Sequence, residues 1–115
     1  MAAVALNKFR TIRVNIPTSV VGIYTCPIGV ASIVILSHVT NTSSGISSIT
    51  AFHSRPTEPV VDFKLANEVP IPPNDSYSIV SDGRLALETN DIIKVQATEG
   101  NSLELILSIL ETAKQ

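Results

Sequence analysis

The segment from Ser102 to Leu110, which reads SLELILSIL, carries an apolar side chain at every second position. In an extended strand, side chains two residues apart share a face. One face is therefore wholly apolar and consists of Leu103, Leu105, Leu107 and Ile109. The other face holds polar residues, but it also includes Ile106 and Leu110. A strand with one face in water rarely has two large aliphatic residues there, so the sequence predicts that both faces are covered, by the chain itself or by a neighbouring subunit.

A helix is the alternative for this segment. Residues 103–114 contain good helix formers, and Leu103, Ile106, Leu107 and Leu110 also recur at helical spacing. The preceding loop 98–101 contains Gly100 and Asn101, which are typical of a hairpin connection. Because the alternation is also unbroken, we expect a strand over 102–112 that pairs with a strand over 92–97.

Short segments with strand composition follow one another along the whole chain, separated by Pro, Gly, Asn and Asp. This spacing is typical of an antiparallel sandwich or barrel. The sequence therefore predicts an all-β fold, an antiparallel and jelly-roll-like β-sandwich of about eight strands. Candidate strands besides 92–97 and 102–112 lie at 9–16, 20–25, 30–40, 46–53, 61–66, 77–80 and 84–87.

Two of these segments, and one turn between two others, allow more specific predictions. The β-branched segment 30–40 predicts a central strand in which Ile35 shares a face with Ile33, Ser37 and Val39. In 61–66 the alternation predicts that Val61, Phe63 and Leu65 point inward. The tripeptide Ser81-Asp82-Gly83 has the composition of a tight turn between the strands at 77–80 and 84–87.

At 115 residues the chain has the size of one domain. Residues 1–8 are mostly small and show no clear period, which predicts an N-terminal arm, and residues 9–115 form the predicted sandwich domain. A single cysteine, Cys26, excludes an intrachain disulfide. The N-terminal apolar run is too short for a secretory signal, so we expect synthesis in a reducing cytoplasm.

Charged residues make up 16% of the chain, against about 25% in an average soluble domain, and apolar residues make up 44%. A surface this poor in charge favours a protein whose apolar patches are covered by partners. The net charge is −2 and no basic cluster occurs, so we expect no direct contact with nucleic acid. The longest apolar stretch, 28–36, is too short to span a bilayer, so we expect no membrane partner.

Catalytic motifs are absent from the sequence. His38 lies within a predicted strand and His53 at the end of one, and neither is part of a recognisable nucleophile or acid–base arrangement. Cys26 and the two histidines show no metal-ligand spacing, and no phosphate loop or dinucleotide fingerprint occurs. The sequence therefore predicts a protein that is not an enzyme and has no metal, cofactor or catalytic residues.

Three stretches resemble small virion structural proteins of tailed bacteriophages. Residues 23–34, IYTCPIGVASIV, resemble the opening YTCPaGvtaIV of those proteins. Residues 69–97 resemble their vpIPpnds and grLvLeagDslkvqA motifs, with Asn90 where a glycine is common, and 105–111 resemble their terminal vsiLE. The first 22 residues lie outside this match. The resemblance implies a β-sandwich subunit that is repeated many times in a phage particle.

We therefore expect a non-enzymatic virion protein that is synthesised in the host cytoplasm, foremost a capsid decoration or cement subunit. A neck or tail protein and a receptor- or carbohydrate-binding module on a fibre are the alternatives. The expected partners are further copies of the chain and other virion proteins, such as the major capsid or neck and tail proteins. The candidate interface residues are Val4, Leu6, Ile106 and Leu110.

Overall fold

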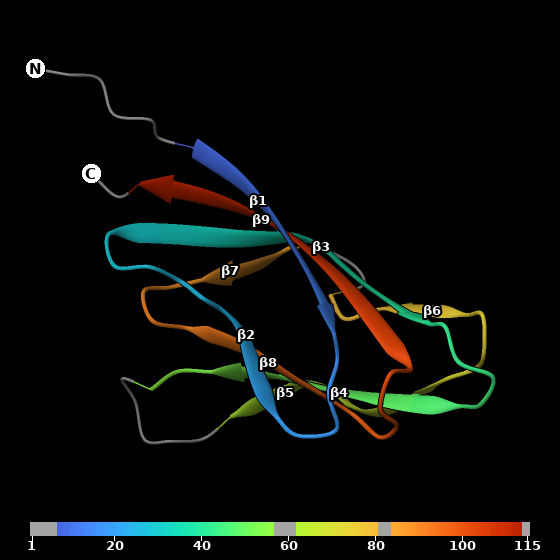
Figure 1. Ribbon diagram of the computed structural model, residues 1–115. Helices are drawn as coiled ribbons and strands as arrows, with labels where there is room; N and C mark the ends of the chain where they lie inside the picture. The colour runs from blue at the N-terminus through green and yellow to red at the C-terminus, as the bar shows by residue number, and fades with distance from the viewer. Residues whose placement is uncertain (1–6, 57–61, 81–83, 114–115) are drawn as a thin grey trace, which may run out of the picture.

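The computed structural model describes residues 7–56, 62–80 and 84–113, and this part of the chain forms nine strands and no helix (Figure 1). The strands run in antiparallel pairs, as the turn-rich spacing of the sequence predicts. Their bounds are β1 Asn7–Asn15, β2 Val21–Thr25, β3 Val30–Asn41, β4 Ser47–Ser54, β5 Phe63–Ile71, β6 Ser76–Ser78, β7 Leu85–Leu87, β8 Ile92–Ala97 and β9 Leu103–Ala113.

The strands form two sheets that face each other (Figure 1). Sheet A has the order β1-β9-β3, and the two short strands β6 and β7 pair with successive parts of the far edge of β3. Sheet B has the order β2-β8-β4-β5. This arrangement confirms the predicted antiparallel, jelly-roll-like sandwich, in which the inner faces of the two sheets enclose the core.

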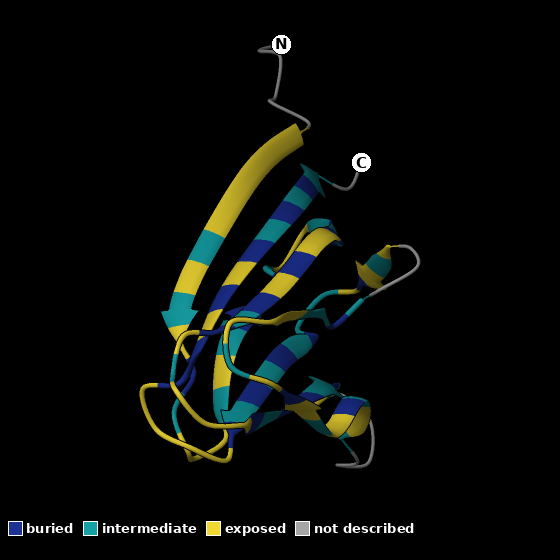
Figure 2. Cartoon of the chain, turned by 90° about the vertical axis from the view of Figure 1, so that its right-hand side faces the viewer, coloured by how far each residue is buried: buried dark blue, intermediate teal, exposed yellow. Residues whose placement is uncertain are grey.

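The core is built from alternate residues of the central strands, which Figure 2 shows as a regular change between buried and exposed positions. Leu103, Leu105, Leu107 and Ile109 of β9 are all buried. They face buried aliphatic residues of sheet B, which are Ile49, Ala51, Ile93, Val95 and Ala97. The alternation in the C-terminal segment therefore confirms a strand, and the helix alternative is wrong.

The predicted hairpin between 92–97 and 102–112 is wrong. The two segments are strands β8 and β9, but β8 belongs to sheet B and β9 to sheet A. The loop between them crosses from one sheet to the other, with Asn101 at a φ of 53° and the Thr98 N–H bonded to the Ser48 carbonyl. Both strands carry an apolar stripe, and these stripes stabilise the fold by packing across the core rather than side by side in one sheet.

The strands flanking Ser81-Asp82-Gly83 do not pair with each other either. Both β6 and β7 pair with β3, which is long enough at twelve residues to hold them one after the other. Residues 81–83 lie outside the described part of the chain. Because β6 and β7 both run antiparallel to β3, they run in the same direction and cannot be the two strands of a hairpin. Local turn composition did not select the partner strand.

Register shifts in β3 and β5 change the predicted inward and outward faces. In β3 the pairing with β9 shifts between Val34 and Leu36, so the extra residue Ile35 is left on the exposed side. In β5 the pairing with β4 shifts twice, and Phe63 is 71% exposed rather than inward. Leu65 does pack against the core, and Val61 lies outside the described residues.

A buried asparagine joins two loops at one end of the sandwich. The Asn41 side chain donates hydrogen bonds of 2.8 Å to the carbonyls of Gly45 and Ile71 and accepts one from the Ser43 N–H. Its polar atoms are therefore satisfied although the residue is fully buried.

None of the described residues forms a helix that could cross a membrane.

The two faces of β9 allow a direct test of this fold. Leu107→Asp places a charge in the core, where Leu107 is 1% exposed, and we expect it to lower the free energy of unfolding by more than about 4 kcal/mol. Ile106→Asp, one residue away on the outer face, should change it by less than about 1 kcal/mol. Chemical denaturation monitored by circular dichroism measures both, and equal losses would contradict the assigned faces.

Candidate interaction surface

The outer face of sheet A, turned away from the core, carries five rows of side chains that run across strands β1, β9 and β3. The two end rows are mainly polar: Asn15, Glu104 and Thr40 form one, and Asn7, Thr112 and Ala31 form the other. The three rows between them hold the large apolar residues. The first of these three rows is Phe9, Leu110 and Ile33, the second is Thr11, Ser108 and Leu36, and the third is Arg13, Ile106 and His38. Their order follows from the antiparallel register, because residues directly opposite each other in a sheet share a face.

Several large aliphatic and aromatic side chains are exposed in the middle of this outer face. Phe9 is 73% exposed, Leu36 46% and Ile106 40%, and the bulge residue Ile35 is exposed next to them. Leu110 and Ile33 are half-buried. A group of exposed large apolar side chains on one sheet face is typical of a protein interaction site.

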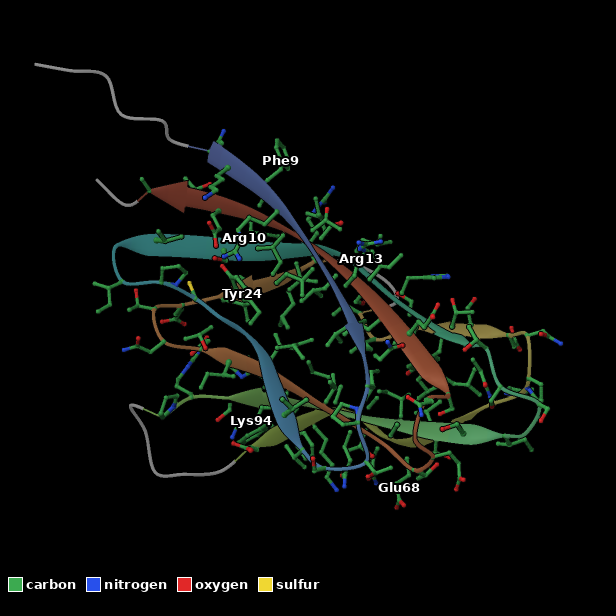
Figure 3. The ribbon with its side chains drawn as sticks, in the orientation of Figure 1. Phe9, Arg10, Arg13, Tyr24, Glu68 and Lys94 are labelled. Atoms are coloured by element: carbon green, nitrogen blue, oxygen red, sulfur yellow. The ribbon has the colours of Figure 1, made fainter. Side chains whose placement is uncertain are left out.

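The outer face of sheet B is different, because polar groups cover it. Lys94, Gln96, Lys64 and Thr50 lie there, and Phe52 is half-buried among them. The Lys94 Nζ is 3.2 Å from the Asp62 carboxylate (Figure 3). Ile92 is also half-buried on this face. The outer face of sheet A therefore exposes more large apolar side chains than the outer face of sheet B, so sheet A is the side better suited to a partner.

The candidate interface residues predicted from the sequence lie partly on this apolar face. Ile106 and Leu110 both belong to it, in rows separated by one residue pair. A hollow beside Ile106 is lined by Arg13, Thr40 and Glu104. Val4 and Leu6 lie outside the described residues. Phe9 and Leu36 were not among the residues predicted from the sequence. The alternation in 9–16 contained the signal for Phe9, because it places Phe9 on the other side of the strand from the inward residues Ile12 and Val14.

Beneath one end of the face, a buried polar group links the two sheets. The Tyr24 hydroxyl on β2 donates a hydrogen bond of 2.5 Å to the Glu111 carboxylate on β9, and it lies 2.7 Å from the Ser32 hydroxyl on β3. Arg10 of β1 reaches the same carboxylate at 3.3 Å and lies over the Tyr24 ring (Figure 3). Burial, together with the bond to Glu111, raises the pKa of Tyr24, so this hydroxyl stays protonated.

A second polar cluster surrounds Asp91, at the turn between β7 and β8. Arg55 donates two hydrogen bonds of 2.8 Å to the Asp91 carboxylate, the Glu88 N–H donates a third, and the His53 Nε2 lies 3.0 Å away. The Arg55 guanidinium holds the pKa of the buried Asp91 carboxyl well below its usual range, and the Glu88 N–H and His53 act in the same direction. The adjacent Asn90 has a φ of 71°. This left-handed conformation is the one expected at a turn position where the resembling phage proteins commonly have glycine.

The side chains of both clusters bond chiefly within the fold. The His53–Asp91 contact orients the imidazole, and the same carboxylate accepts hydrogen bonds from Arg55 and a backbone N–H. Cys26 is fully buried, and its sulfur contacts Ser32 and the carbonyls of Val30 and Leu87. Within residues 7–56, 62–80 and 84–113, no three His, Cys, Asp or Glu side chains are grouped so that they could hold a metal ion. Both clusters act as cross-links within the fold.

No protein-family model matches the sequence, and no curated protein matches it. Solved structures do share its fold. A chain from the study of Bacillus endospore appendages, described as disulfide-linked pili, is 11% identical with a TM-score of 0.54, and the match covers 100% of this chain and 98% of that one.

Two viral chains are similar in the same way. A chain of the acid-stable capsid of a Helicobacter pylori bacteriophage is 10% identical with a TM-score of 0.54, covering 96% of this chain and 90% of that one. A chain of the infectious bursal disease virus particle is 8% identical with a TM-score of 0.51, and 96% of this chain matches 32% of it. At these identities the likeness establishes a shared sandwich fold, found in subunits of capsids and pili.

The role of Asp91 as a cross-link predicts a pH dependence. Its folded pKa lies below the ordinary value of 3.8, so its stabilising effect is complete above about pH 5 and is lost as the pH falls through 3.8 toward the folded pKa. Asp91→Asn should lower the free energy of unfolding by about 2–4 kcal/mol at pH 7.

The difference in the free energy of unfolding between wild type and Asp91→Asn should then shrink as the pH is lowered from 5 to 3. Urea denaturation at a series of pH values measures it. A difference that stays constant over this range would show that the charge of Asp91 does not stabilise the fold.

Proposed function

We propose that this protein is a structural subunit of a tailed-phage virion, which decorates the capsid by docking the apolar outer face of sheet A on neighbouring subunits. The observation that carries this proposal is the group of exposed large apolar side chains over β1, β9 and β3, which includes Phe9, Leu36 and Ile106. The sandwich fold shared with capsid and pilus subunits and the resemblance of three sequence stretches to small virion proteins support it.

The orientation of the subunit follows from its two outer faces. Docking on sheet A removes Phe9, Leu36 and Ile106 from water, and each large apolar side chain that is fully buried contributes about 1.5–3 kcal/mol. The polar side chains of sheet B, among them Lys94 and Gln96, then stay hydrated on the outside of the particle. A cement protein requires one adhesive side and one solvated side, and this chain has both.

The first six residues extend the same surface in sequence. Val4 and Leu6 precede β1, in which Phe9 lies opposite Leu110 on the outer face of sheet A. An arm attached at this end can reach a neighbouring subunit while the sheet face docks. We therefore place Val4 and Leu6 in the interface together with Ile106 and Leu110.

The location is tested by a cryo-electron microscopy map of the particle that contains this chain. Density for the sandwich on the outer capsid surface, repeated with the icosahedral lattice and with sheet A facing the shell, is the expected result. Density limited to a ring at the portal vertex would place the protein in the neck or tail. Absence from purified particles would contradict a virion role altogether.

A substitution on the docking face should weaken attachment without unfolding the chain. Ile106→Asp puts a charge where docking excludes water, and we expect at least a tenfold loss of affinity for particles that lack the protein. The matched control is Ile28→Asp, because Ile28 is 82% exposed in the turn before β3 and lies off the face. Co-sedimentation with particles measures both, and equal binding by the two variants would contradict docking through sheet A.

A further inference from the structure

The open edges of the two sheets are not equivalent. In the described part of the chain, β5 is interrupted by Pro70, by two register shifts and by Glu68 at a φ of 47°. The edge strand β2 has five residues with a bulge, and β6 and β7 have three residues each. Short strands, bulges and prolines are the devices by which proteins prevent another strand from adding to a sheet.

The edge strand β1 is neither short nor interrupted by a bulge or a proline. Charged side chains also protect sheet edges, so its basic residues Lys8, Arg10 and Arg13 limit the strands that can add to it. Its nine residues pair with β9 in one continuous register, and they include neither proline nor glycine. Most of its side chains are exposed on both sides, which Figure 2 shows as an exposed strand at the rim of the sandwich. Alternate residues of an edge strand direct their N–H and C=O groups away from the sheet, so β1 is a template about 30 Å long for a further strand.

We propose that β1 pairs with β1 of a second copy of this chain, antiparallel, around a two-fold axis at Thr11. Thr11 is the midpoint of the strand, so in this register all nine residues of each copy face a residue of the other. Sheet A then continues from one copy into the next. The pairing depends only on the edge and its sequence, so it is independent of which particle, or which part of one, the protein belongs to.

The backbone limits the possible registers. In an antiparallel ladder, the residues that exchange hydrogen bonds must both direct their polar groups toward the partner strand, and in β1 only every second residue does so. Pairing can therefore shift from the Thr11-centred register only by two residues at a time. Each such shift keeps odd-numbered residues opposite odd-numbered residues and even-numbered residues opposite even-numbered ones. The nearest alternatives are centred on Arg10 or on Ile12.

The charges of β1 and its length exclude these two alternatives. Centring on Arg10 places this guanidinium directly opposite Arg10 of the partner subunit, and like charges in opposite positions destabilise a sheet. Centring on Ile12 leaves Asn7 and Lys8 of both copies without partners. In the Thr11-centred register Lys8, Arg10 and Arg13 all avoid a basic residue opposite them.

The Thr11-centred register also provides favourable contacts. Arg13 lies opposite the partner's Phe9 on the outer face, where Phe9 is 73% exposed in the single chain, and a guanidinium over an aromatic ring is attracted to it. On the inner side, Arg10 is already neutralised by Glu111 at 3.3 Å. The apolar outer faces of two copies then join into one surface across the new strand pair.

A cross-linking experiment tests the pairing on the full-length protein. In the Thr11→Cys variant the two introduced cysteines lie opposite each other, with Cα atoms about 4.5–5.5 Å apart, which suits a disulfide. We expect mild copper-catalysed oxidation to convert this variant to a covalent dimer. The buried Cys26 provides no competing thiol. The matched control is Asn67→Cys on the interrupted edge strand β5, which should stay monomeric on a non-reducing gel.

A charge variant tests whether the pairing drives association. Thr11→Lys places two ammonium groups opposite each other at the axis, and light scattering coupled to size exclusion should show its mass falling from twice the chain mass to that of one chain. Asn67→Lys should keep the wild-type mass. A wild-type protein that is monomeric at high concentration, a Thr11→Lys variant as large as wild type, or no Thr11→Cys cross-link would overturn the pairing. Docking through the face of sheet A would stand after any of these results.

Discussion

The strand β9 is the element on which the rest of the structure depends. It is hydrogen-bonded along both edges, to β1 over nine residue pairs and to β3 over almost its whole length. Its inner side chains, such as Leu105 and Leu107, form the centre of the core. Its outer side chains Ile106 and Leu110 lie in the middle of the apolar face. One strand therefore connects the stability of the sandwich with the surface that we assign to docking.

The two polar clusters explain how the sandwich holds its sheets together with a single cysteine. The Tyr24–Glu111 hydrogen bond joins β2 of sheet B to β9 of sheet A, and Arg10 brings the edge strand β1 into the same group. At the neighbouring turn, Asp91 joins Arg55 after β4 to the backbone of Glu88. Buried hydrogen bonds to charged groups are strong and directional, so these contacts determine how the sheets align, whereas the aliphatic core mainly determines that they pack.

The surface of the molecule is divided by function in the same way at its faces and its edges. Sheet B presents polar side chains outward, and its edge strand β5 is blocked by Pro70 and bulges. Sheet A presents an apolar face, and its edge strand β1 is unbroken. The open face and the open edge meet at Phe9, which belongs to both. The proposed pairing through an edge and the proposed docking through a face therefore use different groups of the same sheet.

The sequence by itself determined the all-β class, the approximate positions of most strands and the core residues of β9, because the alternation of apolar side chains is a local property of the chain. It predicted a strand at 61–66, whereas β5 runs from Phe63 to Ile71 and includes Pro70. It also identified the excess apolar residues Ile106 and Leu110. Tertiary structure alone decided that β8 and β9 lie in different sheets, that a bulge exposes Ile35, and that Asp91 meets Arg55 and His53. These features depend on which strands become neighbours. Strand pairing is set by packing between residues far apart in the chain, and a local pattern carries no record of it.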